Sequence, residues 1–372
     1  MKNKIFAGVF ALLLLALSVL TLALPKKEFS QTENRTLASF PEMSRENLLS
    51  GKLTADAADY LADHYVGRDL FVSVHSAFEV LLGKREHGGV YLTKHGLMDS
   101  FTEGDAKKFD ENLAAVTQFA SIMAEGNVRC RVLISPTGTQ VYADELPAGC
   151  DTVDSAPYFE ALSSVPGFVD VRETFASHED EALFYKTDHH WTSRGAYLAY
   201  AALKESLGEE APSEESYQIE TVTNEFYGTL YSRFALFLPL FKDTVEAPAD
   251  AALPALTRTG SKGEKANSLY APDKLEGKDK YLYFLGGNDS IIEIETAAGT
   301  GRSLILVKDS YANAFLPYLA RDYDRITVID LRYFAQDLVT NLVRQNGYTD
   351  ALVLYNLKSF ASDTNLALLP LQ

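Results

Sequence analysis

The sequence predicts an α/β fold in which a central parallel sheet is flanked by helices. Compact apolar runs at residues 130–135, 303–307, 325–330 and 351–355 alternate with stretches of helical periodicity. Strands of a parallel sheet are covered on both faces and therefore read as continuous apolar runs, and their alternation with helices is typical of the α/β class. The chain has 372 residues, 47% of them hydrophobic, which is enough for one large domain or two modest ones.

Helices are expected wherever apolar residues recur at helical spacing, at residues 53–82, 106–124, 192–207, 311–322 and 334–346. The first of these stretches is expected to cover a core. Additional strands are expected at residues 167–171 and 182–185, and a hairpin at residues 88–97. From about residue 208 to residue 280 the pattern weakens into Glu, Ala, Pro, Gly and Ser, which predicts a variable insertion near the functional site.

The N-terminus carries an apolar segment long enough to cross a membrane. Residues 5–24 contain no charge and are preceded by Lys2 and Lys4; at about 1.5 Å per residue such a helix spans a hydrocarbon core of about 30 Å. The lysines favour a cytoplasmic N-terminus, which places the rest of the chain outside the cytoplasm. A cleavable signal peptide is the alternative, but the run exceeds the usual apolar length of about 7 to 15 residues. We expect a single-pass protein of the cell membrane.

The predicted organisation is an anchor or signal peptide at residues 1–24, a polar juxtamembrane linker at residues 25–55, and an α/β domain at residues 56–372. A net charge of −17 argues against a nucleic-acid partner, because phosphate binding needs concentrated Lys and Arg. Cys130 and Cys150 could pair outside the cytoplasm or remain free thiols. No metal site is expected, since no C-x-x-C motif is formed and the remaining histidines are scattered.

The densest chemical signal is the string Thr-Asp-His-His-Trp-Thr at residues 187–192. In extended backbone alternate residues share a face, so Asp188 and His190 are expected on the same side. An Asp beside a His can accept the Nδ1 hydrogen and fix the tautomer of the ring. A metal half-site is the alternative for this cluster. Trp191 is expected to be a packing residue.

Ser310 is the matching candidate nucleophile. It follows the predicted strand 303–307 and precedes the predicted helix 311–322, and open α/β sheets place their ligands at the carboxyl ends of their strands. The first N–H groups of that helix could stabilise an oxyanion. A serine between a strand and a helix is also a common helix cap, which is the structural alternative. The two segments together predict a Ser-His-Asp triad of Ser310, His190 and Asp188.

Several strings give the chain a family resemblance: TDHHWT, KDSYANAF, ENRTLASFP, LISPTGTQVY, IDLRYF and VLYN. Together they resemble the bacterial DHHW family, which is related to the SGNH-like alginate O-acetylation proteins. The resemblance implies an SGNH-hydrolase-like sheet with a circularly permuted order of motifs, in which Asp188, His190 and Ser310 are the triad and His189 is a variable position. For the oxyanion hole or for substrate binding, the resemblance suggests Asn356 and Arg332. Two further candidates are Asn288, in a Gly-Gly-Asn string that could equally be a turn, and Tyr311, at the start of the predicted helix.

The expected function is that of an extracytoplasmic O-acetyltransferase that modifies a cell-surface or exported polysaccharide. No nucleotide or coenzyme A signature is present, so no cofactor is expected. The resemblance implies a membrane-bound O-acyltransferase partner that supplies acetyl groups. Two alternatives remain: a carbohydrate esterase that uses the same triad with water as acceptor, and a non-catalytic polysaccharide-binding or scaffold component of an export complex.

Overall fold

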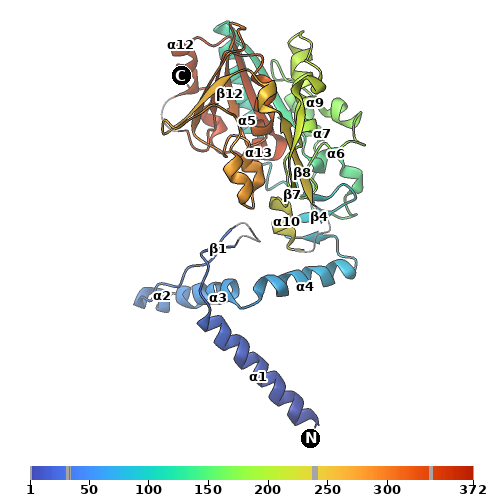
Figure 1. The fold of residues 1–372 in the computed structure, drawn as a ribbon, viewed down its shortest axis with the longest axis vertical. Helices are drawn as coiled ribbons and strands as arrows, with labels where there is room; N and C mark the ends of the chain where they lie inside the picture. Colours follow the sequence, from blue (N-terminus) through green and yellow to red (C-terminus); the bar gives the residue numbers. More distant parts are fainter. Residues whose placement is uncertain (1, 31–32, 34, 237–241, 335–337, 372) are drawn as a thin grey trace. The chain divides into compact units, whose positions relative to one another are not determined.

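The computed structural model describes residues 2–30, 33, 35–236, 242–334 and 338–371. The chain divides into two compact units (Figure 1). The smaller unit consists of Met1–Gly88 and Tyr231–Leu240, and the larger unit of Gly89–Leu230 and Phe241–Gln372. The division into anchor, linker and single domain inferred from sequence stays a prediction.

A seven-stranded sheet forms the centre of the larger unit, in the order β10-β9-β11-β13-β12-β14-β6. Its strands are β6 (Arg129–Ser135), β9 (Leu256–Gly260), β10 (Lys265–Ala266), β11 (Ile291–Thr296), β12 (Ser303–Lys308), β13 (Arg325–Ile329) and β14 (Asp350–Asn356). The four predicted apolar strands are confirmed as the parallel group β13-β12-β14-β6. The sheet as a whole is mixed, because β9, β10 and β11 add antiparallel pairs.

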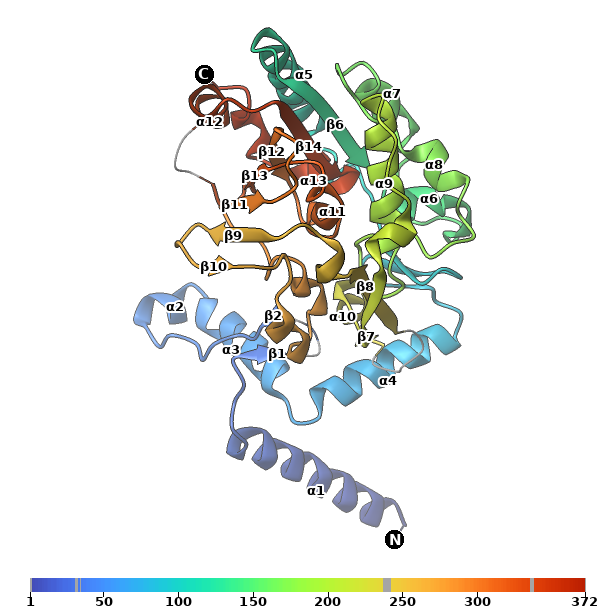
Figure 2. The ribbon, with the colours of Figure 1, turned by 45° about the horizontal axis from the view of Figure 1, so that its top comes forward.

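Helices cover both faces of this sheet (Figure 2), which explains why the parallel strands are mainly apolar. Along β12, Leu304 and Leu306 belong to one core, and Ile305 and Val307 belong to the other. The first core includes residues of α8 (Arg172–Ala176), α9 (Ser193–Ser206) and α11 (Ala312–Leu319). The second includes residues of α5 (Phe109–Glu125), α7 (Ala156–Leu162), α12 (Val339–Asn346) and α13 (Leu357–Ser362). The expected helix at residues 334–346 is thus α12, although residues 335–337 lie outside the described part of the chain.

One sequence expectation is wrong in detail, and the insertion expected at residues 208–280 contains strands that its weak pattern did not predict. Residues 167–171 and 182–185 are not strands; they contribute single bridges, Phe168 to Val132 and Phe184 to Trp191. The weakly patterned segment 208–280 contains antiparallel strands β7 (Ile219–Phe226) and β8 (Asp243–Pro248) as well as β9 and β10. β7 is largely exposed and carries Glu, Thr and Asn, so it lacks the apolar run that marks a strand buried on both faces.

The remaining elements of the larger unit are short. The expected hairpin is confirmed by the antiparallel pair β4 (Val90–Leu92) and β5 (Leu97–Asp99). The short helices are α6 (Gly138–Val141) and the 3-10 turns η1 (Ala143–Glu145), η2 (Glu214–Tyr217), η3 (Asp250–Ala252), η4 (Pro272–Glu276), η5 (Lys280–Tyr283) and η6 (Leu366–Leu368). α10 (Thr229–Phe234) spans the boundary between the two units. Cys130 and Cys150 are both free thiols.

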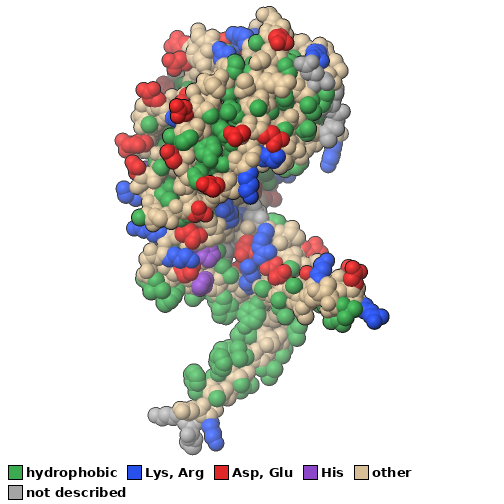
Figure 3. All heavy atoms as spheres, turned by 180° about the vertical axis from the view of Figure 1, so that it is seen from behind, with side chains coloured by type: hydrophobic (Ala, Val, Ile, Leu, Met, Phe, Trp, Pro, Cys, Tyr) green, Lys and Arg blue, Asp and Glu red, His purple; other side chains and the backbone are tan. Residues whose placement is uncertain are grey.

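The smaller unit is built from helices α1 (Lys2–Ala23), α2 (Arg45–Leu49), α3 (Lys52–His64) and α4 (Arg68–Leu81), with strands β1 (Phe29–Ser30), β2 (Arg35–Thr36) and β3 (Glu86–His87). Asn3–Ala23 is, within the described residues, the one helix long and apolar enough to cross a membrane, a test that a signal sequence also passes. Helices are confirmed in residues 53–82, but the expectation that they cover a core is wrong. Their large apolar side chains, such as Leu70, Phe78 and Leu82, are more than half exposed, and Figure 3 shows hydrophobic side chains along the edge of this unit from which α1 projects.

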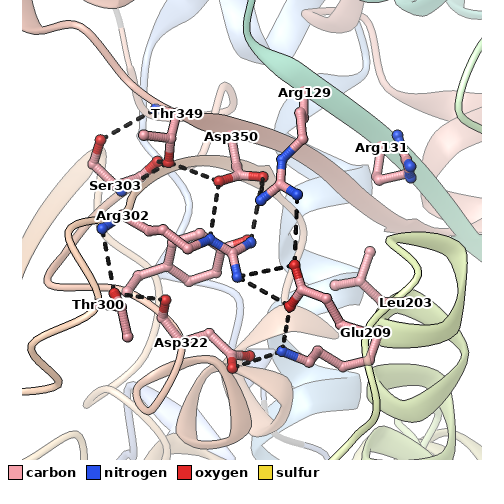
Figure 4. A network of polar contacts seen from close by, with 12 residues as sticks. Arg129, Arg131, Leu203, Glu209, Thr300, Arg302, Ser303, Asp322, Thr349 and Asp350 are labelled. Atoms are coloured by element: carbon pink, nitrogen blue, oxygen red, sulfur yellow. Dashed lines mark hydrogen bonds and ion pairs between the residues drawn. The ribbon is translucent and has the colours of Figure 1, made fainter.

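An ion network closes the amino-terminal ends of the parallel strands (Figure 4). Asp350, at the start of β14, pairs with Arg129 at 2.9 Å and with Arg302 at 3.4 Å. Arg302 also pairs with Glu209 at 3.0 Å, and Glu209 pairs with Lys204 of α9 at 2.6 Å. The Asp350 side chain is only 3% exposed, so its charge is stabilised by two guanidinium groups rather than by water.

Candidate active site

His190 lies within hydrogen-bonding distance of both Asp188 and Ser310. Ser310 follows β12 at the carboxyl edge of the sheet, and His190 precedes α9, whose N-cap is Thr192. His190 Nδ1 lies 2.5 Å from Asp188 Oδ1, and His190 Nε2 lies 2.7 Å from Ser310 Oγ. The structure therefore brings together two segments that are 120 residues apart. The Asp188 and His190 side chains are buried, while Ser310 is partly exposed.

Asp188 is fixed by residues that the sequence did not single out. Its Oδ2 accepts hydrogen bonds from Thr229 N at 2.8 Å and from Thr229 Oγ1 at 3.0 Å. Gly228 has no room for a side chain, because a Cβ atom there would lie 2.3 Å from the Asp188 Cβ. These two residues belong to the weakly patterned segment 208–280, which thus reaches the functional site. Only its position in an otherwise featureless segment could have drawn attention to the Gly-Thr pair.

A second carboxylate, Asp243, binds the backbone of the two residues that precede Asp188. It accepts hydrogen bonds from Lys186 N and Thr187 N, both at 2.8 Å, and from Thr187 Oγ1 at 2.5 Å. Burial raises the pKa of Asp243, and the three donors oppose that shift. Asp243 opens β8, so the β7-β8 pair positions the loop in front of α9. The sequence missed this residue because an Asp at the start of a strand carries no distinctive spacing.

The electrostatics of the buried pair set its protonation. Burial and the neighbouring His189 lower the pKa of His190 and Asp188 opposes them, which results in a pKa of about 4. Burial would raise the pKa of Asp188, but His189, His190 and the hydrogen bonds to the carboxylate outweigh it and lower this pKa. At neutral pH the imidazole is therefore neutral and the carboxylate charged, which leaves His190 Nε2 able to accept a proton from Ser310.

Tyr281 forms one wall of the site. Its ring stacks on the imidazole of His190, with ring centroids 3.7 Å apart and an interplanar angle of 11°. Its hydroxyl donates to the backbone carbonyl of Ser310 at 2.9 Å. Because the one side chain contacts both His190 and Ser310, it fixes the imidazole relative to the serine and covers that face of the ring. Nothing in the sequence distinguished Tyr281 among the 20 tyrosines of the chain.

Comparison with known proteins places this geometry in a family. The family model described as DHHW protein matches residues 87–329, which is more than half of the chain. The chain belongs to the DHHW family. Among solved structures, a DHHW family protein from Eubacterium siraeum superimposes with a TM-score of 0.64 at 23% identity, covering 76% of this chain and 95% of that one. Bacillus cereus PatB1 with a sulfonyl adduct gives a TM-score of 0.61 at 19% identity, covering 75% and 98%. At these identities the likeness shows a shared fold.

A curated relative extends the comparison beyond the fold. Over 230 residues the chain is 23% identical to a protein of Pseudomonas syringae pv. tomato that is named "Probable alginate O-acetylase AlgJ". The alignment covers 58% of this chain and 58% of that protein. The chain thus spans less than two thirds of the length of this relative.

The four residues of the Asp-His-His-Trp string differ in their burial and in their contacts. Trp191 is fully buried and its Nε1 donates to the Tyr311 carbonyl at 2.9 Å, so its expected packing role is confirmed. The ring of His189 is partly exposed and its Nδ1 lies 2.8 Å from Thr229 Oγ1. Asp188, His189 and His190 present ligand atoms within 4.8 Å of one another, as metal ligands do. Both ring nitrogens of His190 are nevertheless engaged by Asp188 and Ser310, which favours proton transfer over metal binding.

Of the four predicted oxyanion or substrate-binding residues in this DHHW protein, Asn356 and Arg332 are held by carboxylates. The Asn356 Nδ2 group donates to Asp309 Oδ2 at 2.6 Å and to Ser359 Oγ at 2.8 Å, which uses both of its hydrogens. Arg332 forms two hydrogen bonds to Asp330, at 2.8 Å and 2.6 Å. Asp309 directly precedes Ser310, and it also accepts from Tyr311 N at 2.8 Å. Asn356 therefore contacts the residue before Ser310, and its amide has no hydrogen left for an oxyanion.

Tyr311 is placed inside the protein. It is fully buried, and its hydroxyl donates to the backbone carbonyl of His189. Its ring packs against His190 and Trp191, with centroid distances of 5.4 Å and 4.9 Å. The side chain thus links the segment that carries Ser310 to the segment that carries His190.

Asn288 differs from the other three because the oxygen of its side-chain amide accepts hydrogen bonds while the nitrogen has no protein partner within the described residues. Lys308 Nζ donates to Asn288 Oδ1 at 2.8 Å, and Asn313 Nδ2 donates to the same oxygen at 3.3 Å. Lys308 is fully buried at the end of β12, and burial lowers its pKa to about 8 against the opposing effect of Asp330. Within the described residues, neither Asn288 Nδ2 nor the backbone N–H of Ser310 donates to another protein group. Asn288 is also exposed, so its N–H groups can meet a substrate.

Proposed function

We propose that this DHHW protein is an O-acetyltransferase in which Ser310 carries the acetyl group, His190 moves the proton and Asp188 orients His190. The observation that carries the proposal is the continuous chain of hydrogen bonds from Asp188 through His190 to Ser310, with contacts of 2.5 Å and 2.7 Å. A serine hydroxyl becomes a useful nucleophile only when an adjacent base removes its proton. The partial exposure of Ser310 beside a buried His190 meets that requirement.

The reaction proceeds in two balanced halves. Ser310 Oγ attacks the acetyl carbonyl of a donor while His190 Nε2 takes the hydroxyl proton, and the imidazolium then returns that proton to the leaving group. This step leaves an acetyl ester on Ser310. A sugar hydroxyl then attacks the ester, His190 accepts its proton, and the proton passes to the departing Ser310 oxygen. Asp188 stabilises the transient imidazolium through the Nδ1 contact.

The oxyanion formed in each half needs hydrogen-bond donors that are free in the resting enzyme. The Nδ2 amide of Asn288 and the backbone N–H of Ser310 are the groups at this edge of the sheet that meet the condition within the described residues. Lys308 and Asn313 fix the Asn288 amide through its oxygen, which supports a preorganised donor. Arg332, which is partly exposed beside Asp330, is then left for substrate binding, and Asn356 acts as a positioning residue through Asp309.

The acceptor proposed is a cell-surface or exported polysaccharide. The curated relative is named as an alginate O-acetylase, which supports a glycan hydroxyl as acceptor. The apolar helix α1 supports a chain anchored in the cell membrane with its catalytic unit outside the cytoplasm. A donor is then delivered across the membrane by a membrane-bound O-acyltransferase partner. The fold proposed is an SGNH-hydrolase-like sheet with permuted motif order, because Asp188 and His190 precede Ser310.

The experiment compares acetyl transfer with hydrolysis in the full chain. A chromogenic acetyl ester is supplied with and without a polysaccharide acceptor whose hydroxyl groups are free. Release of the chromophore and acetylation of the glycan are both measured. Wild type should acetylate the glycan. Ser310→Ala should lower both readouts by about 10³-fold or more, whereas Ser164→Ala, an exposed serine, should match wild type.

The other outcomes separate the alternatives. Hydrolysis that continues at the same rate with every glycan, without transfer, would identify a carbohydrate esterase that uses the same triad. Equal glycan acetylation by wild type and Ser310→Ala would show that the site is not catalytic, and a polysaccharide-binding or scaffold role would replace the proposal.

A further inference from the structure

The helix α4 in the smaller unit presents an unusually apolar exposed face. Large apolar residues recur along it at helical spacing and end in the residue just past its last turn. All are between 52% and 81% exposed: Leu70, Phe71, Val74, Phe78, Leu81 and Leu82. A continuous exposed face of this kind marks a site of contact with lipid or protein, and neither the triad nor the polysaccharide acceptor makes use of it.

The beginning of α4 is tied to the end of the apolar helix α1. Val66 N donates to Thr21 Oγ1 at 3.2 Å, and His64 Nε2 lies 3.0 Å from the carbonyl oxygen of Lys27. The corner between α3 and α4 is therefore attached to the last turn of α1 and to the residues that follow it. Both ribbon views show α3 and α4 running across the end of α1 rather than alongside it (Figures 1 and 2).

The distribution of hydrophobic side chains over the smaller unit is also visible. Hydrophobic side chains gather along the edge from which α1 projects (Figure 3). Exposed cations stand just beyond the two helices: Lys26 and Lys27 follow α1, and Lys84 and Arg85 follow α4. Apolar side chains on one face with Lys and Arg at the margins are the composition of a helix that lies in a membrane interface.

We propose that α4 lies in the surface of the membrane that α1 spans, with its apolar face among the lipid acyl chains. The inference rests on the proposed anchoring by α1. If α1 crosses the bilayer, its last turn lies near the headgroups, and the hydrogen bonds from Val66 and His64 hold the start of α4 at the same level. The lipid surface is then the nearest apolar phase. Lys27 and Arg85 can then meet lipid phosphates, whereas Lys84 pairs with Glu79 and Lys26 donates to the Thr21 carbonyl.

The experiment places a fluorescent reporter on the face. Trp191 is the only native Trp and is fully buried, so a Trp introduced at the surface can be followed above its constant signal. Full-length Phe78→Trp and, separately, Leu81→Trp are reconstituted into phosphatidylcholine vesicles with and without bromine atoms on the acyl chains. Glu103→Trp, at an exposed position of the larger unit, is the matched control. Flotation of the vesicles and hydrolysis of an acetyl ester are measured on the same samples.

Quenching of Phe78→Trp and Leu81→Trp by brominated lipid should exceed that of Glu103→Trp by about twofold or more, and iodide should quench them less. Equal quenching of all three variants with free access to iodide would overturn the inference, and would leave a protein partner as the occupant. Shielding from iodide without quenching by lipid would point to a second copy of the chain and would also overturn it. Protein that fails to float would refute both the anchor and this inference, while ester hydrolysis reports on the triad independently.

Discussion

The two ends of the parallel strands in the larger unit are both rich in charge but differ in how that charge is used. At the amino-terminal ends, Asp350 faces Arg129 and Arg302, and the contacts continue through Glu209. At the carboxyl ends, the buried Lys308 pairs with Asp330 at 3.6 Å and also donates to the neutral amide oxygen of Asn288. Within the described residues, the Nδ2 group of Asn288 and the backbone N–H of Ser310 donate to no other protein group. The charges at the amino-terminal ends pair with one another, whereas Lys308 at the carboxyl ends also orients a polar group that remains available to a ligand.

The difference shows that a dense group of charges does not by itself mark an active site. Ion pairs that satisfy each other hold strands together and present nothing to a ligand. Donors that the protein orients but leaves without a protein partner are better indicators of chemistry, because they are open to a ligand. Asn288 and Ser310 show this feature at the carboxyl edge, where open α/β sheets bind their ligands.

The largest expected effect separates the two adjacent histidines. His190→Ala should lower turnover of an acetyl ester by about 10³- to 10⁴-fold, because the serine loses its base. His189→Ala should have a much smaller effect, because its ring contacts Thr229 rather than Ser310. Steady-state kinetics of the purified variants, with circular dichroism to verify folding, measure both. Similar losses in the two variants would contradict the assignment of the base to His190.

A smaller effect on kcat is expected when the side-chain amide of Asn288 is removed. Asn288→Ala should lower kcat by about 10²- to 10³-fold if the Nδ2 group stabilises the oxyanion. Asn288→Asp is the matched test, because a carboxylate still accepts the hydrogen bond from Lys308 but has no N–H to donate. Equal losses in kcat for the two variants support the donor role. Recovery of activity in Asn288→Asp would instead show that only the contact with Lys308 matters.

The sequence predicted much of this arrangement because its signals are local. A strand buried on both faces forms a continuous apolar run, so β6, β12, β13 and β14 could be predicted from the sequence alone. Asp188 and His190 are near neighbours, and Ser310 follows a strand, so their spacing was also informative. Thr229, Asp243 and Tyr281 could not be found in this way, because their importance depends on contacts with distant residues. The same limit explains why Asn356, expected as a donor, contacts Asp309 instead.

The acid limit of activity tests the environment of the carboxyl edge. Since burial lowers the pKa of His190 to about 4, the base stays neutral well below the usual histidine value of about 6.5. Turnover should persist from pH 8 to about pH 5 and then fall about tenfold per unit below about pH 4. The folded-state pKa is depressed, so the contribution of His190 to stability is present above pH 6.5 and lost as the pH falls to about 4.

Titration of a second group, Asp279, could also produce an acid limb in the pH profile of activity. Asp279 has its pKa raised to about 6 by burial, with the charge of Asp188 adding to the shift. The pH profile of Asp279→Asn is therefore the control. An acid limb near pH 6 in wild type that disappears in Asp279→Asn would assign the titration to Asp279 and contradict its assignment to His190.

The smallest effect on turnover is expected at the opposite end of the strands. Asp350→Asn removes the carboxylate that faces Arg129 and Arg302, and the free energy of unfolding should fall by about 2 kcal/mol, less than for a fully buried pair because both arginines retain contact with water. Urea denaturation followed by the fluorescence of the buried Trp191 measures this loss in the larger unit. The kcat of the folded enzyme should stay at the wild-type value, since Asp350 begins β14 while Ser310 follows the far end of β12. A large drop in kcat without a loss of stability would mean that the amino-terminal network takes part in the reaction, and the contrast between the two ends would fail.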